Sequence, residues 1–422
     1  MYKRQNLDYR AIDSFYDYPR VQGLAEMMNS YGVIHNDPEV VSKIVASQAH
    51  HKKIDGHAPG LQGKDLDTYV AAGVYSDHEC ATMEDALAKL QRGQFIMIRE
   101  GTAARNLEAL APLLTPQYAE RCMFCTDDKH PSDLLEKGHI DYIAREAINK
   151  YGVDPIIAVE AACHHASRYF LLNNRGAIAP GYLADFAVID NFKDFNVEMV
   201  FKKGILYWNN GELRDFEAPK IEEYLDKRAH DTFHVSTLTP DDFRDTRQRG
   251  VLGMVPGEII TTDNGYADHV DLEKDILKIA VVERHKGTHH IGLGYIQGYG
   301  LKSGAVATSI SHDSHNIIVV GTNSADMAFA ANYIVEHHGG IVVVENGTVK
   351  GDVVLEIAGI MSDRPLTEVN DQLEAAKDAA FTLGVSRGID PFMTLSFMAL
   401  PVIPKLRITT RGVIDVDTQQ YV

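Results

Sequence analysis

Phe95-Ile96-Met97-Ile98 is an unbroken apolar run that ends at Arg99-Glu100-Gly101, and a predicted helix follows it over 103–110. An apolar run without polar alternation predicts a strand that is buried on both faces, as strands of parallel sheets are. A strand, a polar residue at its C-terminal end and then a helix make up the repeating unit of a parallel α/β fold.

The same unit recurs on both sides of this stretch, so that five units lie between about residue 20 and residue 150. The other predicted strands are 21–25, which ends at Glu26; 53–56, which ends at His57; 74–76, which leads to His78 and Glu79; and 122–125, which leads to Asp127 and Asp128. The other predicted helices are 38–50, 64–72, 83–90 and 132–150. A closed (β/α) barrel needs eight units. We therefore predict an α/β protein that begins with a partial TIM-like barrel over residues 1–170, made of the last five units, with the N-terminus incomplete or truncated in evolution.

The remainder of the chain predicts two further parts. A helix over 155–169 leads into a small β-element over 171–215, where glycines and a proline mark tight turns. A charged segment, 217–231, reads as a linker or a surface helix. A separate C-terminal α/β domain is predicted over 225–422, with strands at 277–282, 316–320, 340–344 and 353–357 and helices at 325–336 and 369–383.

Composition narrows the class of protein. With 422 residues, 45% hydrophobic and 24% charged, the chain is an ordinary globular sequence of two or three domains. The formal charge of −18 argues against binding to nucleic acid or to an anionic membrane. Four cysteines are too few for a disulfide framework, and no signal peptide or spanning segment is evident, which predicts a cytoplasmic protein. Cys122-Met-Phe-Cys125 lies in an apolar run and predicts a buried strand rather than a zinc or redox site.

Glu26, His57, His78 and Asp127 each follow or end a different predicted strand. Because the C-terminal ends of parallel strands meet at one rim, these side chains are predicted to converge there. Carboxylates and imidazoles are ligands for divalent metals, and a buried carboxylate is costly unless it is paired or metal-bound.

Other polar residues at this rim allow more than one interpretation. Glu79 and Glu100 are candidates for proton transfer or substrate binding, or are salt-bridge partners of Arg99 or Arg105. Asp128 is a candidate substrate-binding residue or the cap of the next helix.

These motifs carry a resemblance. Gly-Leu-Ala-Glu26-Met-Met-Asn, Asp-Gly-His57-Ala-Pro-Gly-Leu, Asp-His78-Glu79-Cys and Cys-Thr-Asp127-Asp128 resemble bacterial adenine deaminases, a family of the amidohydrolase superfamily. Segments 98–105, 176–181 and 309–316 resemble the same family. The resemblance runs from about Arg20 to the end of the chain, with several motifs in family order.

The resemblance implies a metal-dependent hydrolase that converts adenine to hypoxanthine and ammonia, with two metals per subunit, manganese or iron. It implies that Glu26 bridges the metals, that His57 and His78 bind one of them, and that Asp127 binds the other and shuttles protons. Glu79 would hold the purine and help to protonate its ring. The family's first barrel strand ends in a His-x-His pair, and this chain has no such pair upstream of Glu26.

Several questions stay open at this point. His312, Asp313 and His315 form a motif that either reaches the substrate or makes a structural turn. The activity could instead be hydrolysis of another cyclic amide, or the chain could be an impaired fragment that lacks the His-x-His ligands. The expected partner is a small purine, and a homo-oligomer remains open.

Overall fold

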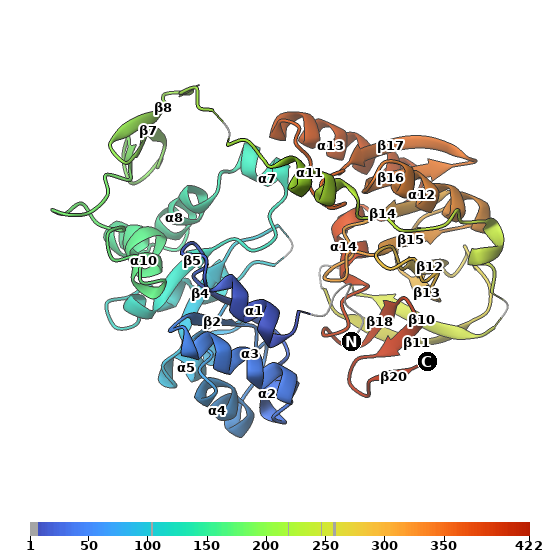
Figure 1. Cartoon of the computed structure of the whole chain (residues 1–422), viewed down its shortest axis with the longest axis horizontal. Coiled ribbons are helices and arrows are strands. Elements are labelled where there is room, and N and C mark those ends of the chain that lie inside the picture. Colours follow the sequence, from blue (N-terminus) through green and yellow to red (C-terminus); the bar gives the residue numbers. More distant parts are fainter. Residues whose placement is uncertain (1–6, 103, 218, 246, 256–258) are drawn as a thin grey trace. The chain divides into compact units, whose positions relative to one another are not determined.

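The computed structural model describes residues 7–102, 104–217, 219–245, 247–255 and 259–422. These residues form two compact units, 7–217 and 219–422, each with its own sheets and its own core. Figure 1 shows the first unit from blue to green and the second from green to red.

The first unit contains five parallel strands in chain order: β1 (Gly23–Met27), β2 (Lys53–Gly56), β3 (Ser76–Asp77), β4 (Phe95–Arg99) and β5 (Cys122–Cys125). β1 pairs with β2, and β3, β4 and β5 form a second parallel sheet. Tyr75, just before β3, joins the two sheets, because its N–H donates to Ile54 of β2 at 2.9 Å. The five strand ends therefore follow one another along one side of the unit.

Helices separate the strands, and short-range signals set where several of them begin. They are α1 (Tyr9–Phe15), α2 (Ser30–Ile34), α3 (Pro38–Ala49), α4 (Gly63–Ala71), α5 (Met83–Gln91), α6 (Leu107–Leu110), α7 (Pro131–Glu136) and α8 (Ile140–Asn149). Asp37 caps α3, with Pro38 at its first turn, and Thr82 caps α5 by accepting from the Asp85 N–H. These boundaries confirm the predicted helices at 38–50, 64–72 and 83–90 to within one or two residues.

The central strands are buried on both faces, as their unbroken apolar runs predict. Ile96 and Ile98 of β4 pack with α8 residues such as Ile143 on one face. Met97, which points the other way, packs with Met123 and Tyr169. Cys122 is fully buried in β5, and the four cysteines are free, which confirms the strand interpretation of the C-x-x-C.

Some boundaries were predicted wrongly. β1 extends to Met27, so Glu26 lies inside the strand rather than after it. The single helix expected over 132–150 is two helices, because Gly138, with φ +103°, breaks the chain between α7 and α8. The helix expected over 103–110 is only α6; Ala103 lies outside the described residues. Gly101 begins a tight loop there, and a Cβ on it would lie 2.5 Å from the Thr126 carbonyl oxygen.

A helical segment and a small antiparallel sheet complete the first unit. Residues 155–169 are helical throughout, as α9 (Pro155–Val159), a π-helical turn (Glu160–His164) and α10 (His165–Tyr169). The sheet that follows consists of β6 (Phe186–Ile189), β7 (Val197–Lys202), β8 (Ile205–Asn209) and β9 (Glu212–Leu213). It corresponds to the β-element predicted from the turn residues.

The second unit begins with the exposed helix α11 (Glu223–His230), which is the surface helix foreseen for the charged segment. Its main sheet has eight strands in the order β11-β10-β13-β12-β15-β14-β16-β17. The strands are β10 (Arg249–Met254), β11 (Thr261–Ala267), β12 (Ile276–Val282), β13 (Ile291–Gln297), β14 (Ala305–Thr308), β15 (Ile317–Gly321), β16 (Gly340–Glu345) and β17 (Thr348–Val354). Three short strands, β18 (Leu406–Thr409), β19 (Gly412–Asp415) and β20 (Gln420–Tyr421), form another sheet.

Both faces of the eight-stranded sheet are covered. One face packs on α13 (Leu366–Thr382) and α14 (Pro391–Phe397), and the other packs on α12 (Ser324–Glu336). Of the four strands predicted here, three are confirmed; the one placed at 353–357 is wrong, because β17 lies earlier in the chain. Among the described residues, no helix combines the length and apolar character needed to cross a membrane.

Candidate metal and proton-transfer site

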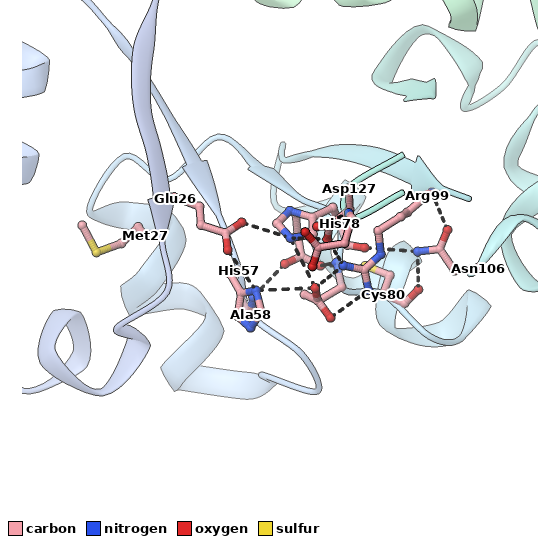
Figure 2. Close-up of polar contacts among 12 residues, drawn as sticks. Glu26, Met27, His57, Ala58, His78, Cys80, Arg99, Asn106 and Asp127 are labelled. Atoms are coloured by element: carbon pink, nitrogen blue, oxygen red, sulfur yellow. Dashed lines mark hydrogen bonds and ion pairs between the residues drawn. The ribbon is translucent and has the colours of Figure 1, made fainter. Parts of the chain in front are cut away.

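Five polar side chains converge at the strand ends of the first unit: Glu26, His57, His78, Glu79 and Asp127. Glu26 comes from β1, and the other four come from the loops that follow β2, β3 and β5. Figure 2 shows Glu26, His57, His78 and Asp127 pointing toward a common centre. The structure thus brings together residues that lie up to a hundred positions apart in the sequence.

The two histidines lie between carboxylates. His78 Nε2 is 3.0 Å from Glu26 Oε2, 3.2 Å from Glu79 Oε1 and 3.8 Å from Asp127 Oδ2. His57 Nδ1 is 3.5 Å from both Glu26 Oε1 and Glu79 Oε1. The side chains of both histidines are about nine-tenths buried, with 12% of His57 and 11% of His78 exposed.

Arg99, at the end of β4, is a member of the cluster that the sequence interpretation treated only as a salt-bridge partner. Its Nη1 donates to Glu79 Oε1 and to Asp127 Oδ2, and its Nη2 donates to Glu79 Oε2 at 3.1 Å. Its position at the end of an apolar strand is the same signal that identified the other members.

The charges in the cluster reinforce one another. Burial alone would raise the pKa of Glu26, but the neighbouring His57 and His78 side chains lower it to about 2. Burial opposes protonation of His78, yet Glu26 and Glu79 raise its pKa to about 10. For Glu79, His78 and Arg99 overcome the effect of burial and hold the pKa of the carboxyl well below its ordinary value.

The donor set fits a divalent cation. Glu26, His57 and His78 each offer one ligand atom within 4.8 Å of the others, and so do His78, Glu79 and Asp127. Among the described residues, the buried His57 Nδ1 has no hydrogen-bond partner, as expected of a nitrogen that is free to bind a metal. Three carboxylates with imidazole nitrogens suit Mn²⁺, Fe²⁺ or Zn²⁺.

Asp127 has an unusual backbone. Its φ is +58°, a left-handed conformation that is uncommon for residues other than glycine. The Asp128 N–H donates to Asp127 Oδ1 at 2.7 Å and leaves Oδ2 to face Arg99 and His78. The turn therefore aims one carboxylate oxygen into the cluster.

Two other candidates near the rim have different surroundings. Glu100 Oε1 lies 3.9 Å from Arg105 Nε, which matches the salt-bridge alternative. Burial outweighs the effect of Arg105 and raises the pKa of the Glu100 carboxyl. Asp128 is exposed, and the N-cap of α7 is His130, so the capping alternative for Asp128 is wrong. Substrate binding by Glu100 or Asp128 stays a prediction.

The histidine motif of the second unit lies in the loop between β14 and β15. His312 Nδ1 is 3.0 Å from Asp313 Oδ1, and the His312 ring stacks on Phe397 with centroids 5.3 Å apart. His315 has φ +48°, as in a turn. A contact of His312, Asp313 or His315 with substrate stays a prediction.

Comparisons with known proteins find matches to both units of the chain. Residues 20–206 match the amidohydrolase family, and residues 258–420 match the adenine deaminase C-terminal domain. The chain is 44% identical over 425 residues to an adenine deaminase of Desulfatibacillum aliphaticivorans, covering 99% of this chain and 74% of that protein. It is 43% identical over 429 residues to an adenine deaminase of Nitratidesulfovibrio vulgaris, covering 98% and 73%.

Similarity at this level spans both units and includes the segments that carry the cluster. The predicted resemblance is thereby confirmed. The chain belongs to the adenine deaminase family of the amidohydrolase superfamily.

Proposed function

We propose that this protein hydrolyses adenine to hypoxanthine and ammonia, with a divalent metal bound by Glu26, His57, His78 and Asp127. The observation that carries the proposal is the convergence of these four side chains in a chain 44% identical to an adenine deaminase. Relatives in two other genera, Dehalococcoides and Kosmotoga, carry the same name at 43% identity.

Asp127 and Glu79 have different proposed roles in the reaction. A divalent cation in this cluster would lower the pKa of a water molecule and so supply a nucleophile near neutral pH. Asp127, with one oxygen facing the cluster, would take one proton from that water and return it to the departing amine, while the proton left on the added oxygen would pass to the ring nitrogen. Glu79, kept ionised by the two hydrogen bonds from Arg99, would accept a hydrogen bond from the protonated ring nitrogen of the purine and stabilise its charge.

The finer features belong to the same proposal. Five parallel strands in chain order, each followed by a helix, support a partial (β/α) barrel with the site on its C-terminal rim. Manganese or iron, two per subunit, is our proposal for the metal. Four free cysteines support a reducing, cytoplasmic location.

The test uses the full chain, purified with Mn²⁺ or Fe²⁺, and follows ammonia release from adenine. His57→Ala should lose bound metal and activity together, whereas His230→Ala, which removes an exposed histidine of α11, should change neither. Glu79→Gln should keep its metal and lose about 10²- to 10³-fold in kcat, the usual effect of removing one group that stabilises charge in the transition state.

Two outcomes would redirect the proposal. Ring opening of hydantoins or dihydropyrimidines, with no ammonia from adenine, would favour a cyclic-amide hydrolase. A folded protein that holds no metal and deaminates nothing would favour an impaired chain. Metal analysis alongside the assay separates these two results.

A further inference from the structure

A second group of buried polar side chains lies next to the metal cluster and is not used by the proposed chemistry. Its members are Tyr69 from α4, Asp77 from β3, Lys89 from α5 and Asn106 from the turn before α6. Tyr69, Asp77 and Lys89 are fully buried, and Asn106 is nearly so. Each of them is hydrogen-bonded to the backbone beside a residue of the cluster.

Asp77 and Lys89 join two ligand-bearing loops. Asp77 Oδ1 accepts from the Ala58 N–H at 2.7 Å, and Asp77 Oδ2 accepts from the Glu79 N–H at 3.0 Å. Lys89 Nζ donates to the Ala58 carbonyl at 2.8 Å and to Asp77 Oδ2 at 3.0 Å. The Ala58 N–H is thus bonded directly to Asp77, and the Ala58 carbonyl is linked to Asp77 through Lys89. Figure 2 shows Ala58 among these contacts.

Tyr69 and Asn106 extend the same arrangement to the neighbouring strands. The Tyr69 hydroxyl accepts from the His57 N–H at 3.0 Å and donates to the Met27 carbonyl at 2.5 Å. Asn106 donates to the carbonyls of His78 at 3.2 Å and Cys80 at 3.0 Å. Side chains from behind the rim thus connect β1 to β2, β2 to β3, and β3 to the Asn106 turn.

The cluster around Lys89 is not a second metal site. Asp77, Cys80 and Asp85 have the spacing of a metal-binding group. The Lys89 ammonium, however, lies 3.0 Å from Asp77, 2.9 Å from Asp85 and 3.5 Å from the Cys80 sulfur. The cation that these groups require is therefore already supplied by the chain.

A buried ion pair is seldom a strong source of stability, because removing two charges from water offsets much of their attraction. The geometry of Asp77 and Lys89 indicates a different contribution. We propose that they are positioning residues, which set the distance between the His57 loop and the His78–Glu79 loop so that the ligands meet around the metal. This inference rests on the proposed function.

Asp77→Asn tests the inference against a matched control, Asp85→Asn. Both variants remove one carboxylate from Lys89, but among the described residues the Asp85 side chain bonds to Lys89 and to no backbone group of either loop. Asparagine at 77 cannot accept from both loops and keep the charged bond to Lys89. We expect Mn²⁺ affinity, titrated on the full chain, to fall about 10- to 100-fold in Asp77→Asn and to stay at the wild-type value in Asp85→Asn.

Amide hydrogen exchange gives a second readout that needs no metal. Peptides that cover residues 57–58 and 78–79 should exchange at least about tenfold faster in Asp77→Asn, with no change in Asp85→Asn. If Asp77→Asn does not fold, the triple variant Asp77→Asn/Asp85→Asn/Lys89→Met, which removes the ammonium together with both of its carboxylates, takes its place in both measurements.

Equal effects of the two single variants, or no effect of Asp77→Asn, would overturn the inference. A wild-type chain that binds no Mn²⁺ or releases no ammonia would count against the proposed function alone. In that case hydrogen exchange still decides whether Asp77 holds the two loops together.

Discussion

At the scale of single residues, Arg99 connects Asp127, the proposed proton-transfer group, with Glu79, the proposed purine-binding group. Its side chain is 8% exposed, and one nitrogen serves both Glu79 and Asp127. Glu26, Glu79 and Asp127 bring three negative charges into a small volume. A planar guanidinium presents its donors in a rigid fork, whereas a lysine ammonium is a point charge on a flexible stem.

Arg99→Met should therefore lower kcat/KM for adenine while leaving the bound metal in place. Hydrogen bonds to charged groups contribute about 1.5–3 kcal/mol, which corresponds to a loss of roughly 10- to 150-fold. Arg99→Lys should recover only part of the activity. Arg105→Met is the control, because Arg105 faces Glu100 rather than the cluster. Equal losses in Arg99→Met and Arg105→Met would contradict this role.

The sequence could identify site residues that stand where a strand ends. His57, His78 and Asp127 satisfy that rule, Glu26 lies one residue before the end of β1, and the structure brings the four together. Arg99 satisfies it too, and only its expected role was incomplete. Tyr69, Asp77, Lys89 and Asn106 could not be identified in this way, because their significance depends on partners up to 42 positions away in the chain.

At the scale of the element, α5 shows how a helix can turn a charge toward the core. Ala86 and Lys89, three positions apart, both face inward, and the side chain of Lys89 is fully buried. Burial opposes protonation, but Asp77 and Cys80 raise the pKa of Lys89 above its ordinary 10.5. The Lys89 amine therefore holds its proton more tightly in the folded state than in the unfolded chain.

This raised pKa predicts a pH-dependent stability. The contribution of the Lys89 ammonium to the free energy of unfolding is fully present below pH 10.5. It is lost as the pH rises through the higher pKa that Lys89 has in the folded protein. Lys89→Met should lower the free energy of unfolding by about 3–5 kcal/mol at neutral pH, because Asp77 is left buried without its cation. The difference in Tm between wild type and variant should narrow above pH 10.5.

Thermal melts of both proteins from pH 8 to pH 12 measure this difference, and Lys227→Met serves as the control. Lys227 makes an exposed ion pair with Glu223 on α11, so Lys227→Met should change the Tm only slightly at every pH. A constant difference across the alkaline range for Lys89→Met would show that its charge is not what stabilises the fold.

Strands with unbroken apolar runs were predictable, and glycine-rich strands were not. β10 and β13 were missed, and each contains two glycines, which weaken the local strand signal. A Cβ on Gly292 would lie 1.9 Å from the Thr409 carbonyl oxygen, and one on Gly294 would lie 2.4 Å from Val413 Cγ2. These glycines let β18 and β19 pack closely on β13, a contact between segments more than a hundred residues apart.

At the scale of the whole molecule, residues 219–422 have the features of an independent domain. Strand residues alternate between two cores: Ile279 and Val281 face one, and Ala280 and Val282 face the other. Helices cover both faces of the sheet, so it needs no other partner to bury its apolar surface. The same part of the chain includes the segment that matches the adenine deaminase C-terminal domain.

We predict that residues 219–422, expressed alone, fold into a compact domain that melts in one cooperative transition. The two cores and the continuous eight-stranded sheet lie wholly within this segment, so separating it from residues 7–217 removes none of those contacts. Near-ultraviolet circular dichroism and calorimetry measure the outcome. A fixed aromatic signal and agreement between calorimetric and van't Hoff enthalpies are expected. A domain that keeps helices and strands but lacks that signal, and melts gradually, would show that its packing depends on the first unit.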